Sequence, residues 1–230
     1  MGVVAALASE ARTLGPSLQR AGTPALRELA WADGGLLAVS GMGEAAAAAA
    51  ASHLVEAGVS ALMTFGMAGG LDPALEAGAV VMPLELISAA GVALPVCRTW
   101  RERVAAAVGP LRTVSDGTLL CSGGAIGSPA DKAAAFRSTG AAAVDMESAA
   151  VAQVAAAHSL PFIAVRVIVD TSADRLPRAV IAASRAGRLK FGRLIAGLAV
   201  APGDIAALLR LARRYRIAMR SLRVIGAHLS

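Results

Sequence analysis

The chain has 230 residues, of which 56% are hydrophobic and 17% are charged, and its formal net charge at pH 7 is +6. This length suits one large α/β domain or two small ones, and since no long linker is visible we predict a single domain over 1–230. No apolar run reaches the roughly 18 to 20 residues that cross a bilayer, which excludes a membrane-spanning helix. Two cysteines supply neither a disulfide framework nor a zinc knuckle, and the N-terminus lacks the basic region of a signal peptide. We therefore expect a cytoplasmic protein without a metal ion.

Short apolar runs alternate with alanine-rich segments, which is the pattern of a mostly parallel sheet covered by helices. The predicted strands lie at 3–7, 36–40, 61–65, 79–83 and 162–169. The predicted helices lie at 43–58, 130–138 and 148–159, and further along at 189–200 and 205–225. We therefore predict the α/β class, with an extended helical segment at the C-terminal end.

The basic residues are concentrated in a helical extension over 174–230, where Asp204 follows Asp174 as the only further acid. Such a surplus suits either nucleic acid or an anionic membrane. Aromatic residues make up only 3% of the chain and no nucleic-acid-binding module is recognisable, so no nucleic-acid partner is expected. On the helix at 205–225 an apolar face is predicted to pack on the core, formed by Ile205, Leu208, Leu209, Ala212, Met219 and Leu222.

Two glycine-rich stretches fall where strands are predicted to end, which is where α/β sheets bind ligands. In Ser40-Gly-Met-Gly43 the glycines free backbone N–H groups for an anion or hydroxyl, or form a tight structural turn. The stretch lacks the third glycine of a dinucleotide fingerprint and a Walker lysine. In Phe65-Gly-Met-Ala-Gly-Gly-Leu71 the glycines indicate a crowded backbone beside a ligand or beside another strand.

Carboxylates also stand in unusually apolar surroundings. Asp170 ends the run Val165-Arg-Val-Ile-Val-Asp170, where it either caps the next turn or, with a pKa raised by burial, acts as an acid. Alternation along the strand would place Arg166 and Asp170 on one face. Asp145 and Glu147 lie within an Ala- and Val-rich segment, and we expect Asp145 to be structural, paired with an arginine such as Arg166.

These stretches together resemble the superfamily of purine nucleoside phosphorylases and methylthioadenosine/S-adenosylhomocysteine nucleosidases. Their order and spacing match over about residues 1 to 175, in Glu10, Ser40-Gly-Met-Gly43, Ala68-Gly-Gly-Leu71, Val144-Asp-Met-Glu-Ser148 and Val165-Arg-Val-Ile-Val-Asp170. The resemblance implies a three-layer α/β/α fold with a central mixed sheet, a homo-oligomer, and an enzyme that cleaves the bond between ribose and a purine.

The resemblance also implies roles for individual residues. Asp170 would protonate N7 of the purine, and Glu10 would activate water. Substrate binding would fall to Met146 and Glu147 at the ribose, together with Met67, Ala68, Gly69 and Ile126. Ile126 stands where the nucleosidases have an aromatic residue that stacks on the base. We expect Asp170→Asn to reduce turnover with little effect on folding.

Phosphorolysis and hydrolysis remain open at this point. The stretch from Thr64 to Gly70 lacks the arginine that nucleoside phosphorylases commonly use to bind phosphate. The remaining candidates for phosphate are Gly41, Gly43 and Arg12. No cofactor is expected, and inorganic phosphate would be a co-substrate only in phosphorolysis.

A narrower resemblance extends over nearly the whole chain. Asp174-Arg-Leu-Pro177, Gly187-Arg188 and the segment at 201–213 are similar to the hopanoid-biosynthesis-associated phosphorylases. This implies removal of adenine from adenosylhopane, a substrate so insoluble that the basic residues within 189–223 would contact anionic lipid at the inner membrane face. The alternatives are a methylthioadenosine/S-adenosylhomocysteine nucleosidase, another purine nucleoside phosphorylase, or a non-catalytic nucleoside- or lipid-binding protein. The presence of Glu10, Glu147 and Asp170 argues against the last.

Overall fold

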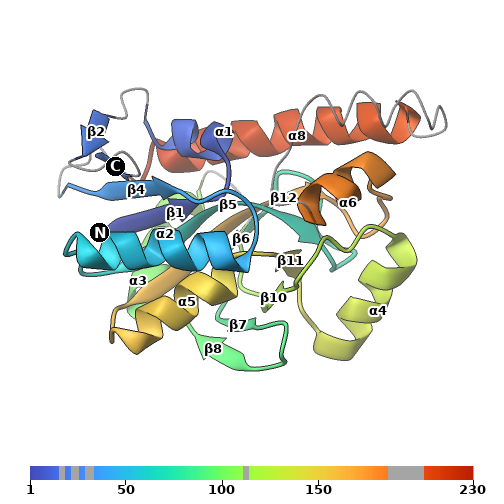
Figure 1. The fold of residues 1–230 in the computed structure, drawn as a ribbon. Helices are drawn as coiled ribbons and strands as arrows, with labels where there is room; N and C mark the ends of the chain where they lie inside the picture. Colours follow the sequence, from blue (N-terminus) through green and yellow to red (C-terminus); the bar gives the residue numbers. More distant parts are fainter. Residues whose placement is uncertain (16–18, 22–25, 29–33, 111–113, 186–204, 230) are drawn as a thin grey trace.

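A computed structural model describes the chain apart from residues 16–18, 22–25, 29–33, 111–113, 186–204 and 230. Among the described residues, a single 12-stranded sheet lies between helices (Figure 1). The strands are β1 Gly2–Ala5, β2 Gln19–Ala21, β3 Leu26–Glu28, β4 Leu36–Val39, β5 Leu62–Gly70, β6 Val80–Val81, β7 Glu85–Ile87, β8 Ala93–Pro95, β9 Val114–Ser115, β10 Leu119–Cys121, β11 Ala143–Asp145 and β12 Phe162–Asp170. The helices are α1 Ala8–Ala11, the short 3₁₀ helix η1 Arg12–Leu14, α2 Glu44–Glu56, α3 Arg98–Val108, α4 Pro129–Thr139, α5 Ser148–Ala157, α6 Arg178–Arg185 and α8 Ile205–Gly226.

The sheet is mixed, as the resemblance implied, and β5 is its centre. The strand order is β2-β3-β4-β1-β5-β11-β10-β7-β8, and β12 pairs with both β5 and β6. β1 and β12 run parallel to β5, whereas β11 runs antiparallel and pairs with Gly69 and Gly70 at the end of β5. Three strands therefore pair with β5, and residues that follow each of them line one cavity together with the second half of β5.

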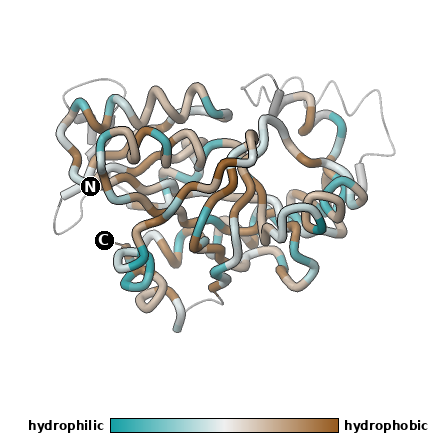
Figure 2. Tube along the Cα trace, turned by 90° about the horizontal axis from the view of Figure 1, so that it is seen from below, coloured by the Kyte–Doolittle hydropathy of each residue, from teal (hydrophilic) through white to brown (hydrophobic). Residues whose placement is uncertain are grey.

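Separate hydrophobic cores fill the two faces of the sheet, which confirms the predicted three layers. On one face α2 and α5 pack on the sheet through small side chains such as Ala47, Ala51 and Ala152. On the other face α8 packs on the sheet, with Met219 and Leu222 in the same cluster as Phe65. Apolar residues follow the central strands in Figure 2. Alanine lets helices approach the sheet closely, which accounts for the high hydrophobic content without a membrane span.

Helix α8 belongs to this fold, because its inner side is core. It contacts β12 and η1, and Ala218, Leu222 and Ile225 are completely buried. The predicted apolar face is wrong in part: Leu209 is 67% exposed and Ala212 is exposed as well. The predicted helix at 189–200 lies outside the described residues. Among the described helices, none combines the length and the apolar character needed to span a bilayer.

Strand β5 is longer than predicted, and the glycine stretch forms its second half. The prediction ended the strand at residue 65, but pairing with β12 continues to Gly69. A Cβ atom at Gly66 would lie 2.8 Å from Arg166 Nη1 and 2.8 Å from Glu10 Oε1, closer than such contacts occur. The absence of a side chain at Gly66 thus leaves room for the side chains of Arg166 and Glu10 beside β5.

Candidate active site

A cavity of about 200 Å³ opens beside the C-terminal end of β5. Its lining includes all eight residues predicted for catalysis or substrate binding, namely Glu10, Met67, Ala68, Gly69, Ile126, Met146, Glu147 and Asp170. The other described residues of the lining are Ala6, Leu7, Met42, Ser122, Ala125, Val144, Asp145, Val169, Leu176 and Val180. Segments that are far apart in sequence therefore supply carboxylates and apolar side chains to one site.

Glu10 is held rigidly beside β5. Its Oε2 accepts a hydrogen bond from Leu7 N at 2.9 Å and its Oε1 accepts one from Met67 N at 3.0 Å. The side chain is almost completely buried, and burial raises the pKa of Glu10, while Arg166 and the backbone donors partly oppose the shift. A carboxylate whose pKa is raised by burial is a stronger base, which suits general-base catalysis.

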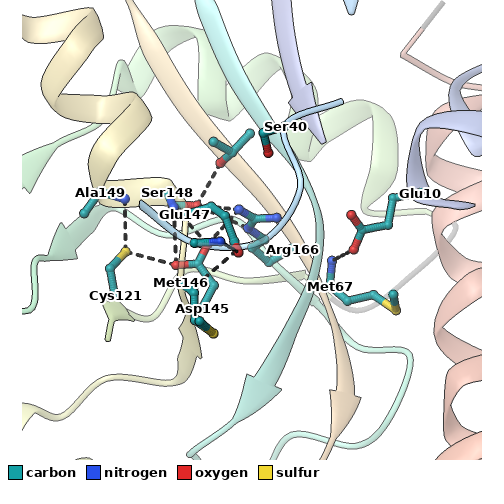
Figure 3. Close-up of polar contacts among 12 residues, drawn as sticks. Glu10, Ser40, Met67, Cys121, Asp145, Met146, Glu147, Ser148, Ala149 and Arg166 are labelled. Atoms are coloured by element: carbon teal, nitrogen blue, oxygen red, sulfur yellow. Dashed lines mark hydrogen bonds and ion pairs between the residues drawn. The ribbon is translucent and has the colours of Figure 1, made fainter. Parts of the chain in front are cut away.

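Asp145 belongs to a buried network of polar side chains (Figure 3). Its Oδ2 lies 2.7 Å from Arg166 Nη2, and its Oδ1 accepts from Cys121 Sγ at 3.0 Å. Arg166 Nη2 also donates to Ser148 Oγ at 2.9 Å. Burial would lower the pKa of Arg166, but the carboxylates of Asp145, Glu147 and Glu10 raise it. The expected pairing of Asp145 with Arg166 is therefore confirmed.

Glu147 lines the cavity next to this network. Its Oε1 accepts a hydrogen bond from Gly43 N at 2.9 Å, which joins the start of α2 to the segment after β11. Burial, together with the nearby charge of Asp145, raises the pKa of Glu147 to about 7. The carboxyl therefore changes charge near neutral pH, at a place where a bound ligand would contact it.

Asp170 is paired with a lysine that sequence reasoning missed. Its Oδ2 accepts a hydrogen bond from Nζ of Lys132. This lysine lies in the first turn of α4 and is completely buried. Burial raises the pKa of Asp170, and the ammonium of Lys132 works against that shift. One feature of the sequence could have drawn attention to this lysine. Most cationic residues of the chain are arginines, and it has only two lysines, Lys132 and Lys190.

A shift in strand pairing places Asp170 at the cavity. The pairing of β12 with β5 moves by one residue between Ile168 and Asp170, so that Asp170 faces Gly69. The simple alternation that put Arg166 and Asp170 on one face is interrupted there. Asp170 contacts Lys132 and Arg166 contacts Asp145, so the two strand residues take part in different ion pairs.

The residues predicted to bind phosphate are absent from the cavity lining. Gly43 N is already used by Glu147, and its φ of +98° belongs to the turn that starts α2. Arg12 lines a separate groove of about 530 Å³, formed with Ser9, Thr13, Tyr215, Arg216, Met219, Arg220 and Arg223. The ionisable side chains among the described lining residues of the cavity are all carboxylic acids. Across the described ranges of the chain, no group of three His, Cys, Asp or Glu side chains is placed to hold a metal ion.

Comparison with known proteins identifies the family of this chain. A family model described as the phosphorylase superfamily matches residues 21–199. The chain belongs to the phosphorylase superfamily. The expected superfamily and the expectation of an enzyme are confirmed. The match does not confirm the narrower resemblance to the hopanoid-biosynthesis-associated phosphorylases.

Solved structures with the same fold cover nearly the whole chain. The 5'-methylthioadenosine/S-adenosyl homocysteine nucleosidase of Campylobacter jejuni is similar with a TM-score of 0.74 at 16% identity, over 99% of this chain and 95% of that chain. The corresponding enzyme of Neisseria meningitidis, in complex with methylthio-immucillin-A, gives 0.69 at 20% identity, over 97% of each chain. The futalosine hydrolase of Helicobacter pylori gives 0.69 at 15%, over 92% of this chain and 96% of that chain.

Proposed function

We propose that this protein hydrolyses the N-glycosidic bond of a 5′-substituted adenosine and releases adenine. The observation that carries the proposal is a cavity with three separately held carboxyl groups, Glu10, Glu147 and Asp170, and no cation among its described lining residues. Cleavage of such a bond develops positive charge on the ribose and negative charge on the base. Carboxylates beside the sugar and an acid beside the base complement both charges.

In the proposed reaction each carboxyl group has one task. Glu10 takes a proton from water, whose oxygen forms a bond to C1′ of the ribose. The bond from C1′ to N9 breaks, its electron pair passes to the purine, and Asp170 gives a proton to N7. Glu147 accepts hydrogen bonds from ribose hydroxyls and stabilises the developing cation, with Met146 against the sugar. The raised pKa values of Glu10 and Asp170 support roles in proton transfer.

The charge of the cavity favours water over phosphate as the nucleophile. A phosphate dianion would enter a space whose described ionisable lining is entirely acidic, and two like charges a few ångströms apart repel strongly in a low-dielectric site. The cations nearest to the site, Arg166 and Lys132, are buried and already bound to Asp145 and Asp170. Arg12 lines the other groove. Water carries no such penalty.

For the substrate we propose adenosylhopane, on the resemblance to the hopanoid-biosynthesis-associated phosphorylases. The apolar residues at the cavity, including Leu7 and Met42, are compatible with an apolar 5′ substituent. The second candidates are methylthioadenosine and S-adenosylhomocysteine. They are favoured by the similarity in fold to nucleosidases that are named for these substrates.

Adenine release with and without phosphate tests the reaction and the substrate together. Purified protein would be incubated with adenosylhopane in detergent, with methylthioadenosine, and with adenosine as a control that lacks a large 5′ group. We expect phosphate-independent release of adenine, a second product with a free hydroxyl on C1′ of the ribose, and the highest kcat/KM for adenosylhopane. Strict dependence on phosphate and a ribose 1-phosphate product would refute hydrolysis. A preference for methylthioadenosine would refute the proposed substrate.

We further propose that the protein lies at the surface of an anionic membrane, as a peripheral protein of the cytoplasmic face. The outer side of α8 exposes Arg210, Arg213, Arg216 and Arg220 next to Leu209 and Ile217. Arg214 is not available for lipid, because it binds Asp174 at 3.0 Å. Exposed arginines beside apolar residues suit an anionic lipid surface, at about 1 kcal/mol for each favourable cation.

Co-sedimentation with liposomes tests this contact. Wild type should bind vesicles that contain phosphatidylglycerol and lose binding at high salt, whereas vesicles of phosphatidylcholine should bind little. Arg213→Glu with Arg220→Glu should abolish binding, and the matched control Arg137→Glu on α4 should not. Binding that is unchanged by salt and by the double reversal would refute the contact.

The resemblance also leads us to propose a homo-oligomer. Light scattering after size-exclusion chromatography measures the mass directly. A mass equal to one chain at micromolar concentration would refute the proposal.

A further inference from the structure

Lys132 occupies an unusual place for a lysine. It is 0% exposed, although lysine is among the residues least often buried without a partner. Its Nζ donates to Asp170 Oδ2, to the carbonyl oxygen of Thr171 at 2.7 Å and to the carbonyl oxygen of Asp174 at 3.2 Å. An ammonium has three N–H donors, and here each one has an acceptor. The side chain of Lys132 is therefore held in one position, with the carboxyl group of Asp170 as its one acidic partner.

The segment that accepts from Lys132 is itself tied down. Asp174 Oδ2 accepts from Thr171 N and from Thr171 Oγ1, both at 2.8 Å. The same carboxylate accepts from Arg214 Nε of α8 at 3.0 Å. The turn after β12 is thus closed by its own side chains and anchored to α8, so that Lys132 meets Asp170 in a rigid frame. The contact between Lys132 and Asp170 is therefore fixed by its surroundings and is not a chance meeting of loosely packed side chains.

We propose that Lys132 is the positioning residue for the acid of the reaction, an inference that rests on the proposed function. By occupying Oδ2 of Asp170, the ammonium leaves Oδ1 as the oxygen that carries the proton toward the cavity. When that proton passes to N7 of the purine, the carboxylate left behind is neutralised by Lys132. The ammonium donates no proton in this step, because it keeps its three acceptors throughout.

Lys132 changes the pKa of Asp170 in a definite direction. An opposite charge within hydrogen-bond distance favours the carboxylate form and makes the neutral acid a stronger proton donor. Catalysis by an acid is lost as the pH rises through its pKa. Removal of Lys132 must therefore move the alkaline loss of activity to higher pH and, at the same time, lower the maximal rate, because the acid has become weaker.

The test compares Lys132→Met, which removes charge and donors, with Lys132→Gln, which keeps a donor for the carbonyl oxygens and so protects the fold. Arg137→Met on the exposed side of α4 is the matched control. For each protein the pH profiles of kcat and kcat/KM for adenine release are measured. We expect kcat to fall roughly 10- to 100-fold in both Lys132 variants, and the alkaline limb to move up by about one to three pH units. Arg137→Met should match wild type.

The outcomes separate the two proposals. If a folded Lys132→Gln variant loses activity without any movement of the alkaline limb, Lys132 is merely structural and the inference is overturned. The same holds if its rate and profile equal those of wild type. If wild type releases no purine from any nucleoside tested, the proposed function fails and the inference falls with it. A moved limb in Lys132→Gln with wild-type circular dichroism supports the inference.

Discussion

The guanidinium of Arg166 and the carboxylate of Asp145 form an ion pair in the interior, with 2.7 Å between Nη2 and Oδ2. Both side chains are almost completely inaccessible to water. Asp145 receives further hydrogen bonds from Ser148 N and Cys121 Sγ, so each charge is satisfied within the protein. Removing water from either ion costs free energy, and the attraction between the two charges offsets that cost only while both partners are present. The pair thus joins β12 to the end of β11.

Removal of one partner should be strongly destabilising. Arg166→Met would leave Asp145 buried without its cation and close to Glu147, and we expect the free energy of unfolding to fall by about 3 to 5 kcal/mol. Urea denaturation followed by circular dichroism measures this difference. The exposed Arg210→Met should change stability by less than about 0.5 kcal/mol. A loss below about 1 kcal/mol in Arg166→Met would contradict the assigned role.

Gly66 should tolerate no side chain. The Cβ atom of Gly66→Ala would lie 2.8 Å from both Arg166 Nη1 and Glu10 Oε1, so at least one of these groups must move. We expect adenine release to fall at least about 10-fold, with a loss of stability of about 1 to 3 kcal/mol. Gly123→Ala is the control, because nothing lies within 4 Å of its Cβ position. Wild-type activity in Gly66→Ala would show that Glu10 does not need its observed position.

Glu147 should make stability depend on pH. Its pKa rises from 4.5 in the unfolded chain to about 7 in the folded protein, so folding favours the protonated form. The resulting stabilisation is complete below about pH 4.5 and is lost as the pH rises to 7, by on the order of 3 kcal/mol. Glu147→Gln should remove this part of the dependence. Urea unfolding of both proteins at intervals from pH 5 to 8 gives the answer, and parallel curves would contradict it.

Asp170→Asn should impair both catalysis and folding. The sequence alone suggests little effect on folding, but the structure shows that the variant would leave the buried ammonium of Lys132 without its carboxylate. We expect adenine release to fall by about 10²- to 10⁴-fold, the usual contribution of a general acid. Stability should fall by a few kcal/mol, because an unpaired buried charge remains. Full stability together with lost activity would argue against an ion pair at this position.

Much of the fold could be predicted from periodicity. The apolar run before Asp170 and the alanine-rich helices correspond to β12, α2, α4 and α5 within a few residues. The segment around Asp145 was identified because charges in an apolar run need partners, and Arg166 was the correct partner. Such arguments succeed where physical chemistry allows a residue few arrangements, as it does for a charge inside an apolar segment.

Features that depend on contacts distant in sequence could not be predicted in this way. The glycines after Phe65 indicate a loop by local propensity, yet they continue β5 because β11 and β12 pair with them. Lys132 resembles an ordinary surface residue of a helix until α4 is placed against the turn after β12. Leu209 fits a helical apolar pattern but is exposed, since the pattern alone does not show which side of α8 meets the sheet.

The dependence of the site on β5 links catalysis to cooperative unfolding. Glu10 hydrogen-bonds to the backbone of β5, Asp170 lies opposite Gly69, and β11, which precedes Glu147, pairs with Gly69 and Gly70. A partly unfolded form that releases this strand would therefore lose contacts that position all three carboxyl groups. Hydrogen exchange at the amides of β5 should therefore report the same opening free energy as loss of activity in denaturant. The enzyme would lose its chemistry in a single step, together with the middle of its sheet.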